Sequence, residues 1–381
     1  MPPRMRREDR RLVAILGFLH GMVHTNILSM PLFLNLAWGP EFQADDVTLG
    51  LLAAIGFGFY GVSSVPIGYL ADRRDPGGLL FLCAAGIAAS NVLLAVSPTI
   101  PVLAISLAAL GLFSGIYHPT GLSTISRTVT EQGRAMGWHG MGGSLGIAAG
   151  PAFVGGSLAL GWSWRLVAGV LIVPAIVSAA LLVLRPPGPQ PDVGARAEPS
   201  GPARRLMTAP YALILLVYMF AGFAYQGVLT FLPKFIPAGF FVLALALGAF
   251  GQVVSGTLAD RRHPNRLLFT LSLAAAGTLL ILGVSSPGGL FTLAAVAFGY
   301  LLFSLEPLQN TLVTAEVPRA LRGLAFGGTF LSVFGIGSIG AALAGRLVAQ
   351  NQTAILFALL AGCLTISGTL ALGIRRARAS P

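Results

Sequence analysis

The sequence predicts an all-α membrane protein with twelve transmembrane helices in two pseudo-symmetric six-helix bundles. Hydrophobic residues make up 55% of its 381 residues and charged residues only 10%, against roughly 25% charged in ordinary soluble domains. With a mean hydropathy of +0.80, the chain has more apolar surface than a core of this size can hide from water. Lipid is therefore the solvent for much of it. The apolar runs and an internal repeat predict how the helices are counted and grouped.

Twelve runs have the length of a membrane span, since a helix needs about 20 apolar residues to cross a hydrocarbon core of roughly 30 Å. In the first half they are residues 11–34, 47–71, 78–97, 100–123, 136–160 and 164–184. In the second half they are residues 210–236, 239–259, 266–285, 289–313, 323–348 and 352–374. The predicted organisation is a tail (1–10), a bundle (11–184), a flexible linker rich in Pro, Gly and Ala (185–209), a second bundle (210–374) and a tail (375–381).

The basic residues predict the orientation. If the N-terminus is cytoplasmic, 21 of the 24 lysines and arginines fall on the cytoplasmic side, which agrees with the positive-inside rule. Only Arg165, Lys234 and Arg346 fall outside. A miscounted helix would destroy this asymmetry, so it also supports twelve crossings. We expect both termini in the cytoplasm and the chain in the cell membrane, which is the inner membrane in a double-membraned bacterium.

The composition argues against other classes of protein. A net charge of +11 could indicate a nucleic-acid partner, but the basic residues are spread between apolar runs rather than gathered on one face. Cys83 and Cys363 lie inside such runs and are typical of small core residues, not of a disulfide framework. The sequence offers no persuasive nucleophile–base pair and no nucleotide-binding loop. We therefore expect no enzyme, no cofactor and no nucleic-acid partner.

The two halves repeat each other at an offset of 188 residues. Gly68-Tyr-Leu-Ala-Asp72-Arg73-Arg74-Asp75-Pro76 recurs as Gly256-Thr-Leu-Ala-Asp260-Arg261-Arg262-His263-Pro264. The same offset relates Gly111 to Gly299, and His118-Pro119 to Glu306-Pro307. Because each half begins on the same side of the membrane, the repeat predicts a parallel arrangement about an axis along the membrane normal. Transporters built this way bind substrate near the midplane, between the halves.

These features resemble the major facilitator superfamily over essentially the whole chain: six plus six helices, a basic central linker and a G-x-x-x-D-R-R loop. Two local patterns are similar to its fosmidomycin-resistance-type drug efflux branch. Helix 1 has His20-Gly-Met-Val-His24-(x6)-Pro31, with His24 where that branch usually has aspartate, and helix 4 has Tyr117-His118-Pro-Thr-Gly. The resemblance implies a secondary transporter, usually monomeric, that works by alternating access and is linked in that branch to drug resistance.

The resemblance also implies a conformational latch in the repeated loop, at Asp72, Arg73, Asp260 and Arg261. A carboxylate beside the N-terminus of a helix can accept backbone N–H bonds and is favoured by the helix dipole, while the adjacent arginine can hold a neighbouring helix. The alternative is that these charges only set the topology. Asp75-Pro76 replaces the family's usual glycine and second basic cluster.

Helix 5 carries a glycine signature that resembles the antiporter motif of drug–proton exchangers, with one residue more before the final glycine pair. Its residues are Gly137, Gly146, Gly150, Pro151, Gly155 and Gly156. Small residues at such spacing let two helices approach closely, and proline distorts the backbone. The alternative is ordinary small-residue packing in a chain with 49 glycines. This signature is the main reason to expect export rather than uptake.

Glu306 stands apart among the 13 acidic residues, because the other twelve lie in loops, termini or helix ends. It precedes Glu316 by ten residues, which places it roughly 15 Å inside the membrane at about 1.5 Å per residue. An ionisable residue at that depth is costly and is a functional candidate by default. We expect it to carry protons or contact substrate, the alternative being a satisfied structural carboxyl.

Four of the five histidines also lie in or near the membrane: His20, His24, His118 and His139. His20 and His24 share one face of helix 1, and His118 occupies the repeat position of Glu306, so those two should face each other. His139 is the weakest candidate. Other polar residues can either reach a substrate cavity or bond between helices: Asn26, Tyr117, Tyr225, Gln226, Gln309 and Asn310.

The leading hypothesis is a proton-coupled antiporter that exports small neutral or cationic organic molecules. Glu306 and His118 would exchange protons and contact substrate, assisted by His20 and His24. One alternative is a transition-metal exporter that uses these same four residues. Others are an uptake symporter and a non-transporting sensor, although such sensors usually carry an added soluble domain. The expected partners are a small-molecule substrate, protons and the lipid bilayer.

Overall fold

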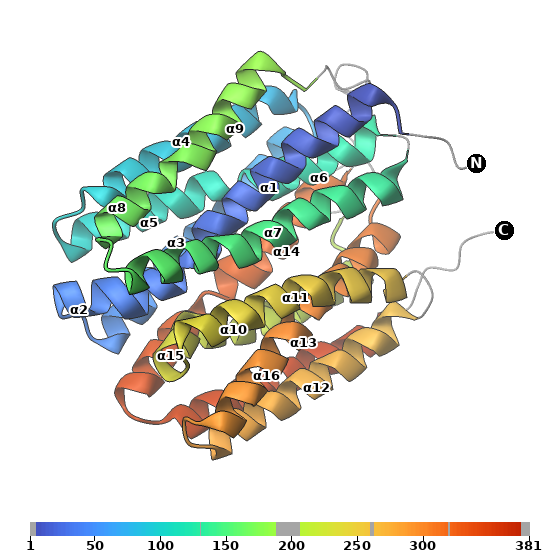
Figure 1. The fold of residues 1–381 in the computed structure, drawn as a ribbon. Helices are drawn as coiled ribbons and strands as arrows, with labels where there is room; N and C mark the ends of the chain where they lie inside the picture. Colours follow the sequence, from blue (N-terminus) through green and yellow to red (C-terminus); the bar gives the residue numbers. More distant parts are fainter. Residues whose placement is uncertain (1–4, 130, 188–205, 260–262, 319–320, 375–381) are drawn as a thin grey trace.

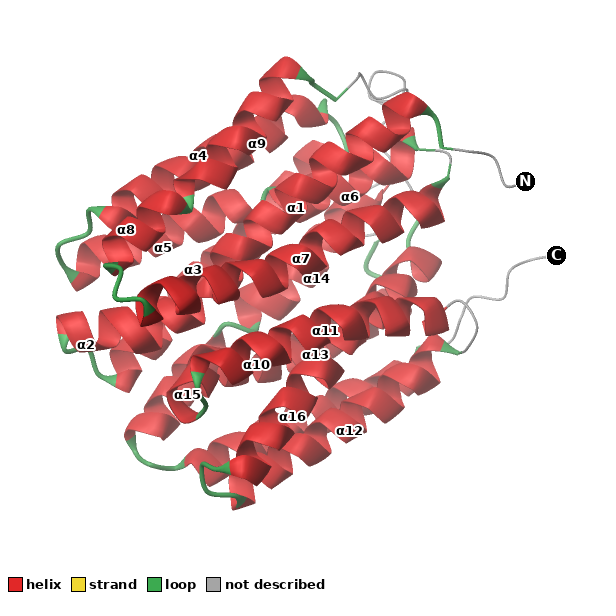
Figure 2. Cartoon of the chain, in the orientation of Figure 1, coloured by secondary structure: helices red, strands yellow, loops and turns green. Residues whose placement is uncertain are grey.

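The computed structural model describes residues 5–129, 131–187, 206–259, 263–318 and 321–374, and every regular element within them is a helix (Figures 1 and 2). Most of the predicted linker lies outside the described residues, as do Asp260 and Arg261 of the predicted latch. The described chain begins and ends at the same end of the helical bundle (Figure 1). We call that end the termini face and the other end the opposite face.

The N-terminal half holds six spans. Their helices are α1 (Arg7–Phe33) continued by η1 (Leu34–Trp38) and α2 (Gly39–Phe42), α3 (Asp46–Ala71), α4 (Pro76–Ala95), α5 (Ile100–Ser114) with α6 (Tyr117–Thr128), α7 (Gln132–Ala159), and α8 (Trp164–Val170) with α9 (Ile172–Leu184). The segments η1 and η4 are π-helical.

The C-terminal half holds the other six. They are α10 (Ala209–Phe235), α11 (Ala238–Ala259), α12 (Pro264–Val284), α13 (Gly289–Glu316), α14 (Arg322–Phe330) continued by η4 (Leu331–Ile336) and α15 (Ile339–Ala349), and α16 (Thr353–Gly373).

The predicted twelve-helix fold is confirmed, with most boundaries displaced by five residues or fewer and the first span running eight residues longer than predicted, to Phe42. Among the described residues, 11 helices are long and apolar enough to cross a membrane. The twelfth in chain order is α7, a helix of 28 residues, which exceeds the roughly 20 that a span requires. It packs between α1 and α11, and its glycines and His139 make it less apolar than the other spans.

Local sequence explains where several spans begin. The Asp45 carboxylate caps α3 by accepting the Thr48 N–H at 2.8 Å, and this bonding lowers the pKa of Asp45. Proline occupies the first position of α4 and of α12, where a missing N–H costs nothing and the fixed φ suits a helix. Pro237 separates α10 from α11 in a turn of only two residues.

The two halves form separate helix groups, the blue-green one and the yellow-red one in Figure 1. Their internal packing repeats at the offset seen in the sequence. A Cβ atom at Gly111 would overlap the carbonyl oxygen of Gly56, and one at Gly299 would lie 2.7 Å from that of Ala244. Both members of the second pair are 188 residues beyond the first, so the same α3–α5 crossing recurs between α11 and α13.

The halves meet along two long seams. One places α3 against α14, η4 and α15, and the other places α7 against α11. Backbones approach closely along the first seam because glycines lie on it: a Cβ at Gly50 would be 2.7 Å from the Ala341 carbonyl oxygen, and one at Gly323 would be 2.8 Å from that of Gly68. These two contacts lie near opposite ends of α3.

The two halves are in contact at both faces of the molecule. On the termini face, Asp72 accepts backbone N–H bonds from Gly323 at 3.2 Å and Leu324 at 3.0 Å. On the opposite face, Lys234 forms an ion pair with Asp46, and the Asn35 side chain donates to the Thr230 carbonyl at 2.7 Å. Each contact joins one half to the other, so the described residues hold the halves together at both faces.

Candidate functional site

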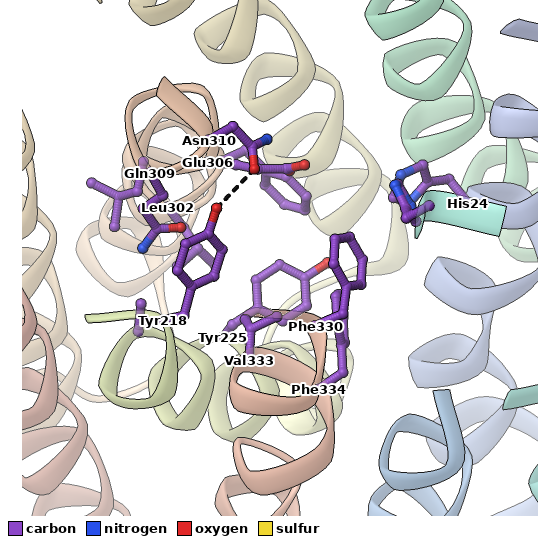
Figure 3. Close-up of a pocket in the computed structure, with 14 residues that line it drawn as sticks. His24, Tyr218, Tyr225, Leu302, Glu306, Gln309, Asn310, Phe330, Val333 and Phe334 are labelled. Atoms are coloured by element: carbon purple, nitrogen blue, oxygen red, sulfur yellow. Dashed lines mark hydrogen bonds between the residues drawn. The ribbon is translucent and has the colours of Figure 1, made fainter. Parts of the chain in front are cut away.

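A cavity of about 50 Å³ lies between the halves (Figure 3). His24 and His118 contribute its N-terminal wall, and residues of α10, α13, α14 and η4 contribute the rest. A buried water needs roughly 10–15 Å³ of such space. The cavity therefore has room for a few waters, and a larger solute requires the halves to move apart.

The C-terminal wall combines aromatic faces with a polar group around Glu306. The Glu306 carboxylate accepts a hydrogen bond from Gln252 Nε2 at 2.7 Å, and Tyr218 donates to Asn310 Oδ1 at 2.7 Å (Figure 3). Gln309 Nε2 is buried and has no hydrogen-bond partner among the described residues. Of the described residues that line the cavity, Glu306 is the one carboxylate, and none is lysine or arginine.

Gln252 connects Glu306 to the other half of the molecule. Its amide oxygen accepts a hydrogen bond from the Ser144 hydroxyl of α7 at 2.9 Å, while its amide nitrogen donates to Glu306. A chain of two hydrogen bonds thus runs from the N-terminal half through α11 to the carboxylate of α13. If α7 moves away from α11, either the Ser144–Gln252 bond breaks, or the Gln252 side chain follows α7 and its bond to Glu306 is disturbed.

All four predicted histidines lie in one buried cluster on the N-terminal side of the cavity. The Nε2 atoms of His20 and His24 are 3.0 Å apart, and His20 Nδ1 is 3.1 Å from the His139 carbonyl oxygen. The His118 ring lies edge-on to both helix-1 histidines, with centroids 4.8 and 5.3 Å away. His139, the weakest sequence candidate, is a full member because its ring stacks on His20 at 4.3 Å.

His118 and Glu306 do line one cavity, as the repeat suggested. His118 also contacts the other half directly, since its ring stacks on Phe330 of α14 with a centroid separation of 4.4 Å. The group of histidines close enough to share a metal ion consists of His20, His24 and His118, without Glu306.

The remaining polar candidates divide into two sets. Tyr225, Gln309 and Asn310 line the cavity, whereas Asn26 and Tyr117 do not. The Asn26 side-chain oxygen Oδ1 accepts a hydrogen bond from Asn91 Nδ2 of α4 at 2.7 Å. Tyr117 bonds to the Leu16 carbonyl oxygen and, at 2.8 Å, to His139 Nε2.

Gln226 is fully buried and also lies away from the cavity lining. Neither atom of its amide has a hydrogen-bond partner among the described residues.

The glycine signature of α7 packs mainly within its own half. A Cβ at Gly146 would overlap the Gly21 backbone, and one at Gly150 would lie 2.5 Å from the Thr25 carbonyl oxygen. Gly137 and Gly156 face open space. Gly155 is the member nearest the other half, with Ala238 Cβ at 3.7 Å from an added Cβ.

The described part of the predicted latch joins α3 to α14 through Asp72. Its carboxylate pairs with Arg127 of α6 and accepts the two N–H groups at the start of α14. Burial raises the pKa of the Asp72 carboxyl, and Arg127 with the two N–H groups opposes that shift. Arg73, in the turn after α3, instead lies with its guanidinium carbon 3.7 Å from the ring centre of Tyr69 near the end of that helix.

Sequence reasoning missed four participants: Gln252, Ser144, Tyr218 and Arg127. The repeat offers a signal for Gln252, because it lies 188 residues beyond Ser64. Within the N-terminal half, the Ser64 hydroxyl donates a hydrogen bond to the Gly115 carbonyl oxygen at 3.2 Å. Arg127 is one of the 21 basic residues on the predicted cytoplasmic side, and nothing in the sequence marks it as the partner of Asp72. No sequence signal separates Ser144 or Tyr218 from other polar residues in the spans.

Comparison with known proteins agrees with this architecture. The sequence matches the profile of the Major Facilitator Superfamily over residues 13–342. It is 24% identical over 254 residues to the cis,cis-muconate transport protein of Acinetobacter baylyi. That match covers 57% of this chain and 59% of the relative, so the chain spans somewhat over half the length of the relative it matches.

Two solved structures share the fold. A bacterial homologue of the human lysosomal transporter Spinster, in an inward-facing and unoccupied conformation, has a TM-score of 0.74 and 18% identity. The match covers 98% of this chain and all of that one. A variant of the nucleoside transporter NupG has a TM-score of 0.73 and 13% identity, with 97% and 100% covered. Twelve spans, a parallel repeat, a cavity between the halves and the family profile lead to one conclusion: the chain is an integral multi-pass membrane protein and belongs to the Major Facilitator Superfamily, a family of transporters and not of enzymes.

Proposed function

We propose that this transporter exchanges protons for small organic molecules and that Glu306 is its proton carrier. The observation that carries the proposal is the hydrogen-bond chain from Ser144 through Gln252 to Glu306. A hydrogen bond to a carboxylate is roughly twice as strong as one between neutral groups. Protonation of Glu306 therefore weakens the hold on Gln252 and, through it, the contact between α7 and α11.

The cavity lining supports small neutral or cationic organic substrates. Tyr225, Phe330 and Phe334 offer aromatic faces, which attract apolar groups and cations. Glu306 supplies one negative charge that a substrate and a proton can share in turn. The proposed direction is export, supported by the resemblance of the α7 glycines to the antiporter motif and of helices 1 and 4 to the fosmidomycin-resistance-type branch.

Flux in proteoliposomes tests the mechanism. For an antiporter, an acidic lumen drives accumulation of an organic cation, because protons leave as substrate enters. For a symporter, accumulation requires the opposite gradient. We expect Glu306→Gln to reduce gradient-driven accumulation to background, whereas Glu316→Gln, ten residues along the same helix, leaves it unchanged. Full gradient-driven transport by Glu306→Gln would contradict the proposal.

A second candidate is transport of small organic acids. The relative from Acinetobacter baylyi is named for transport of muconate, a dicarboxylate, and His24 and His118 on the cavity wall could carry positive charge when protonated. Radiolabelled muconate, set beside a lipophilic cation in the same flux assay, separates the two substrate classes. Accumulation of muconate alone would replace the cationic proposal.

A further inference from the structure

The histidine cluster has a geometry that a proton carrier does not require. His20, His24 and His118 each offer one ring nitrogen, and these three atoms lie within 4.8 Å of one another. All three side chains are buried, and they come from α1 and α6 of the same half. The closest pair of nitrogens, on His20 and His24, is 3.0 Å apart.

The hydrogen bonds around His20 orient it as a metal ligand. His20 Nδ1 is 3.1 Å from the His139 carbonyl oxygen, and a carbonyl can only accept, so Nδ1 carries the proton. The lone pair of His20 Nε2 then points towards His24. Metal-binding histidines almost always donate their other ring N–H in this way, often to a backbone carbonyl, which fixes the tautomer and the ring.

The His24 and His118 rings each have one nitrogen without a hydrogen-bond partner among the described residues. Because His20 Nε2 accepts, His24 Nε2 is the donor of the 3.0 Å bond, and His24 Nδ1 is left with a free lone pair. His24 Nδ1 and His118 Nε2 are both buried, and neither has a hydrogen-bond partner among the described residues. Buried polar atoms are rarely left so, because each unmet bond costs free energy. A metal ion bound to these two atoms would satisfy both, and its binding to His20 Nε2 as well requires the hydrogen bond from His24 Nε2 to be released.

We propose that His20, His24 and His118 bind one divalent transition-metal ion, such as Zn²⁺, Ni²⁺ or Co²⁺, in the N-terminal half. Neutral imidazole suits these ions, and three histidines with one open position are an established zinc geometry. His24 and His118 line the cavity, so the open position faces the space between the halves. The ligands belong to a single half, and binding therefore does not rest on the proposed organic transport.

Direct titration of the purified full-length protein tests the site, after removal of any polyhistidine tag. We expect Zn²⁺ and Co²⁺ to bind with one-to-one stoichiometry, and bound Co²⁺ to show the intense visible absorption of a tetrahedral site. His24→Ala and His118→Ala should each lower the affinity by more than the roughly 10- to 100-fold cost of losing a supporting hydrogen bond. The matched control is His263→Ala, because His263 lies exposed before α12.

The melting temperature without metal, measured on every variant, shows that each is folded. His20→Gln is the second test if either alanine variant fails to fold. Failure of the wild-type protein to bind Zn²⁺ or Co²⁺, or unchanged affinity in folded His24→Ala and His118→Ala, would overturn the proposal. A transport-inactive Glu306→Gln protein that still binds Co²⁺ at one-to-one stoichiometry would support it while leaving the proton mechanism to the flux assay.

Discussion

At the scale of single residues, the polar side chains within the spans separate into those that satisfy each other and those that face the cavity. Asn26 and Asn91 illustrate the first kind, because they bond between α1 and α4 at 2.7 Å inside one half. Asn310 illustrates the second, since it lines the cavity. Bonds between transmembrane helices are worth about 0.6 kcal/mol on average and up to about 1.7 kcal/mol.

Asn26→Ala should therefore destabilise the protein without altering substrate recognition. We expect a loss of about 1 kcal/mol, measured as a lower melting temperature, with an unchanged KM for transport. Asn310→Ala is the matched comparison, for which a higher KM is expected. In a double-mutant cycle, Asn91→Ala should add little destabilisation to Asn26→Ala. A changed KM in Asn26→Ala at an unchanged melting temperature would assign Asn26 to the substrate site instead.

The sequence could predict which polar residues are embedded but not which way each one points. Glu306, Tyr225, Gln309 and Asn310 line the cavity, whereas Gln226, next to Tyr225, does not, and the sequence left both a cavity position and a bond between helices open for the last four. A helix with lipid on one side and apolar neighbours on the other has hydrophobic residues all round. Without an apolar stripe, its rotation about its axis is not readable from the sequence. The sequence likewise could not predict that the histidines of α1, α6 and α7 form one cluster, because a local pattern does not show how separate helices pack.

At the scale of elements, lengths were predictable and irregularities were not. The span predicted at 323–348 is observed as α14, η4 and α15, and its π-helical middle, Leu331–Ile336, carries Val333 and Phe334 of the cavity lining. Single π-helical turns often lie at functional sites. Hydropathy averages over such turns, because a few extra backbone atoms do not change the apolar content of a span.

The glycines of α7 allow a matched test of packing. Gly146→Ala places a methyl group onto the Gly21 backbone of α1, and overpacking of this kind costs typically 1–3 kcal/mol. Gly156→Ala adds a methyl group in open space, where glycine-to-alanine changes in a helix are neutral or stabilise by up to about 1 kcal/mol. We expect a clear fall in melting temperature only for the first. Equal effects would show that the α1–α7 contact is not tightly packed.

At the scale of the whole molecule, the repeat predicted the two-bundle fold because each half must bury the same surfaces. The Gly111–Gly56 contact and its counterpart at Gly299 and Ala244 show that packing follows the sequence offset. Which faces are open or closed is a different matter. The free-energy difference between open and closed states depends on a few contacts between the halves. These contacts are not part of the repeat, and their relative strengths cannot be read from a single sequence.

Those contacts differ in strength on the two faces. The Asp72 side chain is 5% exposed and accepts two N–H bonds from the start of α14, whereas its ion pair with Arg127 lies within the N-terminal half. The Asp46 and Lys234 side chains are 16% and 43% exposed. Exposed ion pairs contribute about 0–1 kcal/mol, whereas hydrogen bonds to charged groups contribute roughly 1.5–3 kcal/mol. The Asp72 bonds should therefore hold the two halves together more strongly than the Lys234–Asp46 pair does.

Loss of the Asp72 charge should open the termini face. Asp72→Asn keeps the shape but lets only one side-chain atom accept, so we expect a shift of about 1.5–3 kcal/mol, or roughly 10- to 150-fold in the open population. Lys234→Gln should change the open population of the opposite face by less than about 5-fold.

Distances between spin labels at Arg74 and His263 report opening of the termini face, and labels at Thr99 and Ser286 report opening of the opposite face. Asp75→Asn, whose exposed carboxylate makes no cap bond, should leave both distances unchanged. A larger opening in Lys234→Gln than in Asp72→Asn would show that the Lys234–Asp46 pair holds the halves together more strongly than the Asp72 bonds do.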